Sequence, residues 1–233
     1  MWKLMKLEWK KNNMKKYVGK AAAITVIIFL MIFATSGELN EVETVEIYGK
    51  SMIGAGVDMF ANMAFMLCTA VMLSSLIISA YQNKTMNLMF SYPIRRQKIL
   101  LSQMLVVWLF NFCALLLCKL LVYGGLVLVS PLAHIAAGAV LPGVTWTDMS
   151  FYINMLVNSA IMVSVSYTAL FVGMRMKSSK AAIVAACIVM LLTQGNIGSF
   201  TLIYNIPFYT GLVVLSAISV FSCVHGVETR DVV

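Results

Sequence analysis

Six apolar runs, most of them long enough to cross a lipid bilayer, constrain this sequence more than any other feature. A helix that crosses the hydrocarbon core, which is about 30 Å thick, needs roughly 17–25 predominantly apolar residues. Hydrophobic residues make up 61% of the 233 residues and charged residues 11%, against about 45–50% and about 25% in soluble domains. The expected fold is therefore all-α, a single transmembrane domain over residues 1–233 with six helical spans. The spans are expected at 18–34, 59–80, 99–124, 151–174, 181–199 and 208–224.

Two of these runs have unusual lengths. The third apolar run, 99–130, would reach about 48 Å as a straight helix at 1.5 Å per residue, which exceeds the hydrocarbon core. It must tilt, protrude or break, and the expected breaking point is Gly124-Gly125. The fifth run has only twelve strictly apolar residues, 181–192, so the polar residues 193–196 are expected to complete the span or to border a cavity. Pro207 predicts the start of the sixth helix.

The basic residues predict the orientation of the chain. Seven lie in residues 1–20, four in segment 81–98, three in the turn 175–180 and one in the C-terminal tail, so fifteen of the seventeen fall on one side of the spans. An excess of lysine and arginine marks the cytoplasmic face. Both termini are therefore expected in the cytoplasm of a protein of the plasma membrane, which fits an even number of spans. Residues 1–20 are expected to form a short interfacial helix, with a solvated basic tail as the alternative.

Several functional classes find no support in the sequence. The net charge of +8 does not indicate nucleic-acid binding, because the basic residues flank membrane spans instead of forming a patch on a soluble fold. The five cysteines lie in apolar runs and form no Cys-x-x-Cys or Cys/His pair, so no metal site is expected. No phosphate-binding loop and no hydrolase motif is present. The chain is therefore not expected to be an enzyme, and no catalytic residue or cofactor is assigned to it.

A few polar residues within or beside the spans are candidates for a transport path. Asp58, near the expected outer end of the second span, could snorkel to water, cap a helix or face a substrate. Lys119 lies inside the third run, where it could snorkel near the outer face or, if deeper, would need a partner inside the bundle. Our prediction follows the snorkelling alternative, so that Lys119→Met should leave function largely intact. The candidate path comprises Asp58, Lys119, Gln194 and Asn196.

The polar segment 81–98, between the second and third spans, contains a pattern of its own. Three apolar residues recur at helical spacing and would form one face of a short helix: Met86, Met89 and Phe90. Pro93 should end this helix, and Arg95 and Arg96 should then lie at the level of the lipid headgroups. An ordinary cytoplasmic loop would explain the same residues.

This segment resembles the coupling-helix region of type-2 ATP-binding-cassette exporter permeases. The resemblance is carried by Lys84, Thr85, Ser91, Tyr92, Pro93, Ile94, Arg95 and Arg96. The beginning of the chain, residues 7–11, and its charged tail, 228–231, are also similar to these permeases. The chain departs from the pattern at residues 81–83, where an acidic residue is usual, and at Gln103, where a lysine is usual. The resemblance implies that the segment docks onto a separate ATPase, through Lys84, Thr85, Met86, Met89, Phe90, Tyr92, Pro93, Arg95 and Arg96.

The resemblance implies that the chain is the transmembrane permease subunit of an ATP-driven exporter. Its small size and compact loops are most similar to permeases that export amphipathic peptides, including bacteriocin-immunity, bacitracin-resistance and phenol-soluble-modulin exporters. The expected partners are cytoplasmic ATPase subunits that hold ATP and Mg, a second copy or a paralogous permease, membrane lipid and an amphipathic peptide substrate. One alternative is a secondary transporter or channel, which should place ionisable groups near the bilayer midplane. The other is a membrane adaptor or immunity protein that transports nothing.

Overall fold

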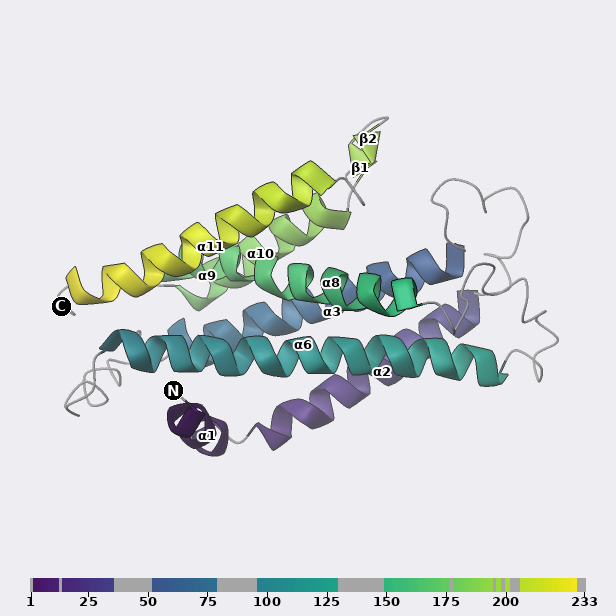
Figure 1. Ribbon diagram of the computed structural model, residues 1–233, viewed down its shortest axis with the longest axis horizontal. Helices are drawn as coiled ribbons and strands as arrows, with labels where there is room; N and C mark the ends of the chain where they lie inside the picture. Colours follow the sequence, from purple (N-terminus) through teal and green to yellow (C-terminus); the bar gives the residue numbers. More distant parts are fainter. Residues whose placement is uncertain are drawn as a thin grey trace. The chain divides into compact units, whose positions relative to one another are not determined.

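The computed structural model describes residues 2–12, 14–35, 52–78, 96–129, 149–176, 178–194, 196–197, 200–201 and 206–229. These residues are almost entirely helical (Figure 1). The elements are α1 (Trp2–Lys11), α2 (Lys15–Thr35), α3 (Met52–Leu73), the π-helical turn η2 (Ser74–Ile78), α6 (Arg96–Val129), α8 (Met149–Val165), α9 (Tyr167–Arg175), α10 (Ser179–Gln194), β1 (Asn196–Ile197), β2 (Phe200–Thr201) and α11 (Ile206–Thr229).

Five of the described helical segments are long and apolar enough to cross a membrane, by length and composition. They are Lys15–Thr35, Gly54–Ile78, Gln97–Val129, Met149–Arg175 and Pro207–His225. The sixth apolar helix, Ser179–Gln194, has 16 residues and reaches only about 24 Å. The structure therefore indicates a multi-pass helical membrane protein with five span-length helices, and the sixth span stays a prediction.

The contacts divide the chain into two compact units. Unit 1 comprises Met1–Met14, Phe65–Phe112 and Ala160–Val233, and unit 2 comprises Lys15–Ala64 and Cys113–Ser159. Three helices, α3, α6 and α8, contribute residues to both units. The expectation of one transmembrane domain stays a prediction.

In unit 2, α2 packs against the last part of α6. The last part of α6 also contacts the first parts of α3 and α8. Phe29 of α2 lies directly over Gly125 of α6, where a Cβ atom would come within 2.7 Å of the ring atom Cε2. Tyr123 packs edge-on against Phe151 of α8, with 5.5 Å between ring centroids. The expected break at Gly124-Gly125 is wrong, since α6 continues through both residues to Val129. Gly125 instead permits a close approach between helices.

In unit 1, α9 contacts both α10 and α11, and η2 contacts α9 and α10. Small residues allow this packing. Ala70 of α3, Ala169 of α9 and Ala186 of α10 form one buried cluster, and a Cβ atom on Gly173 would collide with Ile78 and Ala182. A second buried cluster joins Met66, Met162, Val165 and Tyr209.

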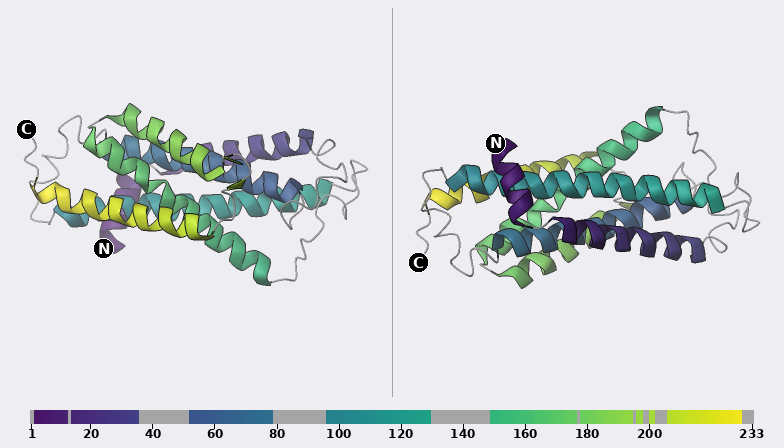
Figure 2. Two further views of the ribbon diagram at one scale, coloured as in Figure 1. Left: turned by 90° about the horizontal axis from the view of Figure 1, so that it is seen from above. Right: turned by 90° about the horizontal axis from the view of Figure 1, so that it is seen from below.

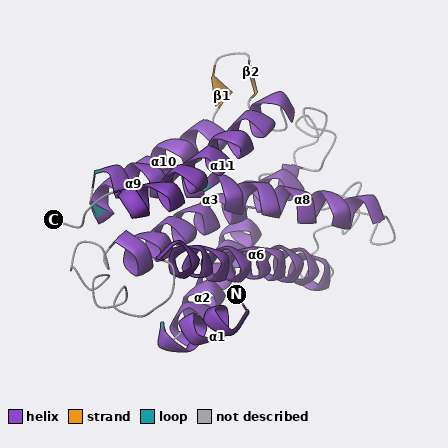
Figure 3. Cartoon of the chain, turned by 60° about the vertical axis from the view of Figure 1, so that its left-hand side comes forward, coloured by secondary structure: helices purple, strands orange, loops and turns teal. Residues whose placement is uncertain are grey.

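Unit 1 also contains α1, the first part of α6 and a short hairpin. Helix α1 crosses α6 (Figure 2), where Trp9 packs edge-on against Phe110 at 5.9 Å between ring centroids. The helical part of the expectation for residues 1–20 is confirmed. Strands β1 and β2 pair antiparallel, Asn196 opposite Thr201, at the connection between α10 and α11 (Figure 3). Helix α11 begins at Ile206, so Pro207 lies in its first turn, as predicted.

Candidate functional site

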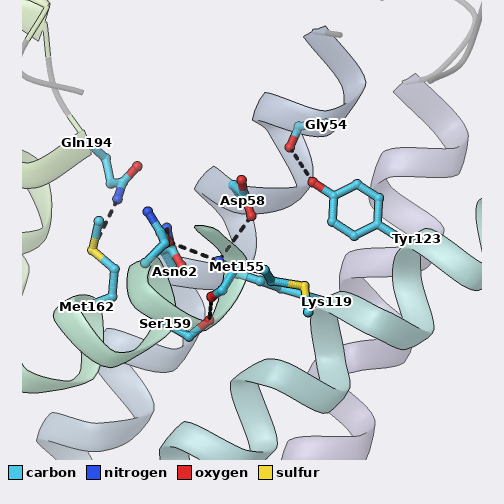
Figure 4. A network of polar contacts seen from close by, with 10 residues as sticks. Gly54, Asp58, Asn62, Lys119, Tyr123, Met155, Ser159, Met162 and Gln194 are labelled. Carbon is cyan, nitrogen blue, oxygen red and sulfur yellow. Dashed lines mark hydrogen bonds and ion pairs between the residues drawn. The ribbon is translucent and has the colours of Figure 1, made fainter. Parts of the chain in front are cut away.

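A buried ion pair joins α3 to α6 inside unit 2. The Lys119 ammonium lies 3.0 Å from the Asp58 carboxylate, and the two side chains are 0% and 11% exposed. The two residues point toward one another from neighbouring helices (Figure 4). Ionisable groups are costly inside a membrane, and when present they commonly pair and serve a function. We therefore take this pair as the centre of the candidate site.

Two asparagines extend the ion pair into a network of four residues. Lys119 Nζ donates a second hydrogen bond, 3.0 Å long, to Asn158 Oδ1 of α8. The same oxygen accepts a bond of 3.1 Å from Asn62 Nδ2 of α3. Asn62 is 3% exposed, and its own Oδ1 has no hydrogen-bond partner among the described residues. The polar network, defined here as Asp58, Asn62, Lys119 and Asn158, thus connects three helices of unit 2.

The spacing of residues along the helices explains why the network forms. On α3, Asp58 and Asn62 are four residues apart, so they lie on the same helix face. On α6, Lys119 and Tyr123 are also four residues apart, and the Tyr123 hydroxyl donates a hydrogen bond of 3.0 Å to the Gly54 carbonyl. Gly54 precedes Asp58 by four residues. The two helices are therefore connected at two successive levels by polar contacts, one made by Tyr123 and one by Lys119.

The depth of the ion pair follows from the helix rise of 1.5 Å per residue. Asp58 lies twenty residues from Ile78 along α3 and η2, which corresponds to about 30 Å. Lys119 lies twenty-two residues from Gln97 along α6, which corresponds to about 33 Å. The pair therefore lies about 30 Å from the end of η2 and from the start of α6. This distance equals the thickness of the hydrocarbon core.

The expectation that Lys119 snorkels to water is wrong. Its side chain is fully buried and makes an ion pair and a hydrogen bond, so it takes the second alternative, a partner inside the bundle. Asp58 likewise neither caps a helix nor extends to water, since α3 begins at Met52, seven residues earlier than the expected span. Two turns of additional helix place Asp58 inside α3, where Lys119 can reach it.

The other candidates for a transport path lie outside this network. Gln194, the last residue of α10, belongs to unit 1, where its side-chain amide donates to Met162 Sδ at 3.8 Å (Figure 4). Asn196 begins β1, and its side chain lies outside the described residues. The sequence reasoning missed Asn62 and Asn158. The signal for Asn62 was available, because it follows Asp58 by one helical repeat of four residues.

Most of the expected ATPase-coupling residues lie outside the described residues. Residues 79–95 lie outside the described part of the chain, and with them Lys84, Thr85, Met86, Met89, Phe90, Tyr92, Pro93 and Arg95. Arg96 is the first residue of α6. The coupling helix therefore stays a prediction.

The fold and the site together define a class, a multi-pass helical membrane protein with a buried, hydrogen-bonded ion pair within its helices. The chain is similar to the uncharacterized protein YcbO of Bacillus subtilis. The two are 25% identical over 201 residues, which cover 85% of this chain and 86% of the relative. No family model matches the chain, and no solved structure matches it.

Proposed function

We propose that this chain is the membrane-spanning permease subunit of an ATP-driven exporter, which moves an amphipathic or hydrophobic substrate such as a peptide out of the cell or the membrane. ATP hydrolysis would take place in separate cytoplasmic ATPase subunits. The observation that carries this proposal is the polar run from Lys84 to Arg96, which resembles the coupling-helix region of type-2 ATP-binding-cassette exporter permeases.

The position of this run along the chain supports the proposal. Seventeen residues, 79–95, separate the end of η2 from the start of α6, and both flanking segments have the length and composition of membrane spans. A connection of this length can hold a short helix and its flanks, at 1.5 Å per residue. Because the basic residues predict that this side faces the cytoplasm, the connection would be accessible to a soluble ATPase.

The experiment replaces the apolar face of the predicted coupling helix. Met89→Ala with Phe90→Ala should leave membrane insertion unchanged, weaken recruitment of the ATPase and abolish export. Truncation of a true interface hot spot costs about 2 kcal/mol or more, which is nearly a thirtyfold loss of affinity. The measurement is a pull-down of the ATPase, compared at equal amounts of permease in the membrane.

A matched control uses two exposed leucines at the other end of α6. Leu121→Ala with Leu128→Ala also removes two large apolar side chains, both of them exposed, but should not change ATPase recruitment. If the Met89/Phe90 variant still recruits the ATPase and exports normally, the segment is only a connector and the proposal loses its main support.

The buried ion pair favours one further candidate, a secondary transporter that needs no ATPase. Such proteins place ionisable groups near the bilayer midplane, where they bind coupling ions. The position of the pair along the helices argues against this candidate. Asp58 and Lys119 lie about 30 Å from the ends of α3 and η2 and of α6 that flank segment 79–95. With those ends at the cytoplasmic surface of the hydrocarbon core, as the basic residues predict, the pair would lie near the opposite surface instead of the midplane. Transport by the purified chain alone, driven by an ion gradient in proteoliposomes, would support the secondary transporter over the exporter.

A further inference from the structure

The polar network contains one hydrogen-bond acceptor more than the described residues satisfy. Lys119 can only donate, so its bond to Asn158 requires the carbonyl oxygen of that amide to face the ammonium. The same oxygen accepts from Asn62, which must therefore present its nitrogen. The Asn62 oxygen is left buried and without a partner among the described residues. A flipped Asn62 amide would set two oxygens against each other, so reorientation does not remove the surplus acceptor.

The group that this network already holds shows which chemistry it accepts. One ammonium lies 3.0 Å from both the Asp58 carboxylate and the Asn158 oxygen. A primary ammonium carries three hydrogen-bond donors. The network offers three acceptor groups, those of Asp58, Asn62 and Asn158. The ammonium of another molecule, if it reached these three groups, could donate one hydrogen bond to each of them.

Lys119 and an external ammonium would exclude each other. The network contains one carboxylate, which neutralises one cation, and two ammonium groups beside it would repel each other in a medium of low dielectric constant. Lys119 is carried on a flexible four-carbon stem, so its ammonium can move away without movement of α6. Lys119 thus has the properties of a tethered competitor.

We propose that Asp58, Asn62 and Asn158 form a recognition subsite for a primary ammonium group of the transported substrate, and that Lys119 fills this subsite when the substrate is absent. The inference rests on the proposed export of an amphipathic substrate. It narrows that substrate to molecules with a cationic amine.

The test compares two amphipathic helical peptides that differ in one residue, lysine in one and glutamine in the other. Each carries a fluorophore and is titrated onto the purified full chain in lipid nanodiscs, with binding to empty nanodiscs subtracted. The measured quantity is the selectivity, the Kd of the glutamine peptide divided by the Kd of the lysine peptide. For the unmodified protein the selectivity should exceed one.

Four variants separate the roles of the residues. Lys119→Met removes the competitor and should raise the selectivity about tenfold or more. Asp58→Asn should lower it to about one, and Asn62→Leu should reduce it. The double variant with Asp58→Asn and Lys119→Met removes both charges of the network, so it should retain the fold while its selectivity stays near one.

Asn111 provides a matched control. It is a buried asparagine of unit 1 whose Oδ1 also lacks a partner among the described residues, and it lies outside the network. Asn111→Leu should leave the selectivity unchanged.

The outcomes distinguish the inference from the proposed function. Equal selectivity in all folded variants, with both peptides bound, would overturn the ammonium subsite and leave the export proposal intact. If Asn62→Leu leaves the selectivity unchanged, Asn62 does not contact the substrate, and its part in the proposed subsite is refuted. Failure of every folded variant to bind either peptide would contradict both the subsite and the export of amphipathic peptides.

Discussion

Removing the charge of Lys119 alone should destabilise the protein about as much as removing both charges of its ion pair, or more. At 3.0 Å and an effective dielectric constant of about 20, the attraction between the Lys119 ammonium and the Asp58 carboxylate amounts to about 5–6 kcal/mol. Much of this attraction offsets the cost of removing both charges from water. Lys119→Met would leave the carboxylate buried and without its counterion, which costs about 3–5 kcal/mol. Asp58→Asn would likewise leave the fully buried Lys119 ammonium without the carboxylate that neutralises it.

In the double variant with Asp58→Asn and Lys119→Met, neither position of the pair carries a charge. Its loss of stability should fall short of the sum of the two single losses by about 2 kcal/mol or more. The sequence-based expectation that Lys119→Met leaves function largely intact assumed that the side chain reaches water, whereas the structure has it buried in an ion pair.

The assay is a double-mutant cycle on the purified chain, with the free energy of unfolding measured in detergent micelles. Lys98→Met is the matched control, because Lys98 is an exposed lysine on the same helix, and its replacement should change stability by less than about 0.5 kcal/mol. Losses of the two single variants that add to within about 0.5 kcal/mol would refute the coupling. A Lys119→Met variant as stable as Lys98→Met would refute the burial argument itself.

Two further predictions concern helix packing and topology. Gly125→Ala should destabilise the protein by about 1–3 kcal/mol, because its methyl group would meet the aromatic ring of α2, whereas Gly124→Ala, with nothing within 4 Å of its Cβ position, should be neutral or mildly stabilising in thermal unfolding. For topology, a cysteine introduced near Glu43 should react with an impermeant reagent in intact cells, and one near Lys177 should not. The reverse labelling pattern would contradict cytoplasmic termini.

The all-helical fold could be predicted from the sequence because a membrane imposes one requirement on every span. The length and apolarity of the runs decide whether a helix can cross, and five of the six expected spans have counterparts of the required length. Helix ends were less predictable. Residues 52–58 include Gly54, Gly56 and Asp58, which favour a loop by composition, yet they are helical in α3. Contacts such as that between Tyr123 and the Gly54 carbonyl stabilise this turn, and no local pattern shows them.

The candidate site was only half predictable for a similar reason. The sequence singled out Asp58 and Lys119 as ionisable residues in apolar surroundings, but it could not decide whether they meet. That depends on the alignment of α3 with α6, which side-chain packing determines. Asn158 could not be predicted, because an uncharged asparagine does not stand out within an apolar span. Its oxygen nevertheless accepts hydrogen bonds from both Lys119 and Asn62.

The unequal lengths of the helices have a consequence for the surrounding lipid. Helix α6 is about 51 Å long, whereas α10 reaches about 24 Å before the β1–β2 hairpin begins. A bilayer adapts to a short apolar wall by thinning and to a long one by thickening or by tilt of the helix, at a cost of fractions of a kcal/mol per Å of mismatch. If α10 crosses the membrane as predicted, lipid beside it should therefore be thinner than lipid beside α6. The stability of this protein should therefore depend on bilayer thickness. A change in the acyl-chain length of the lipid should alter that stability even with every side chain unchanged.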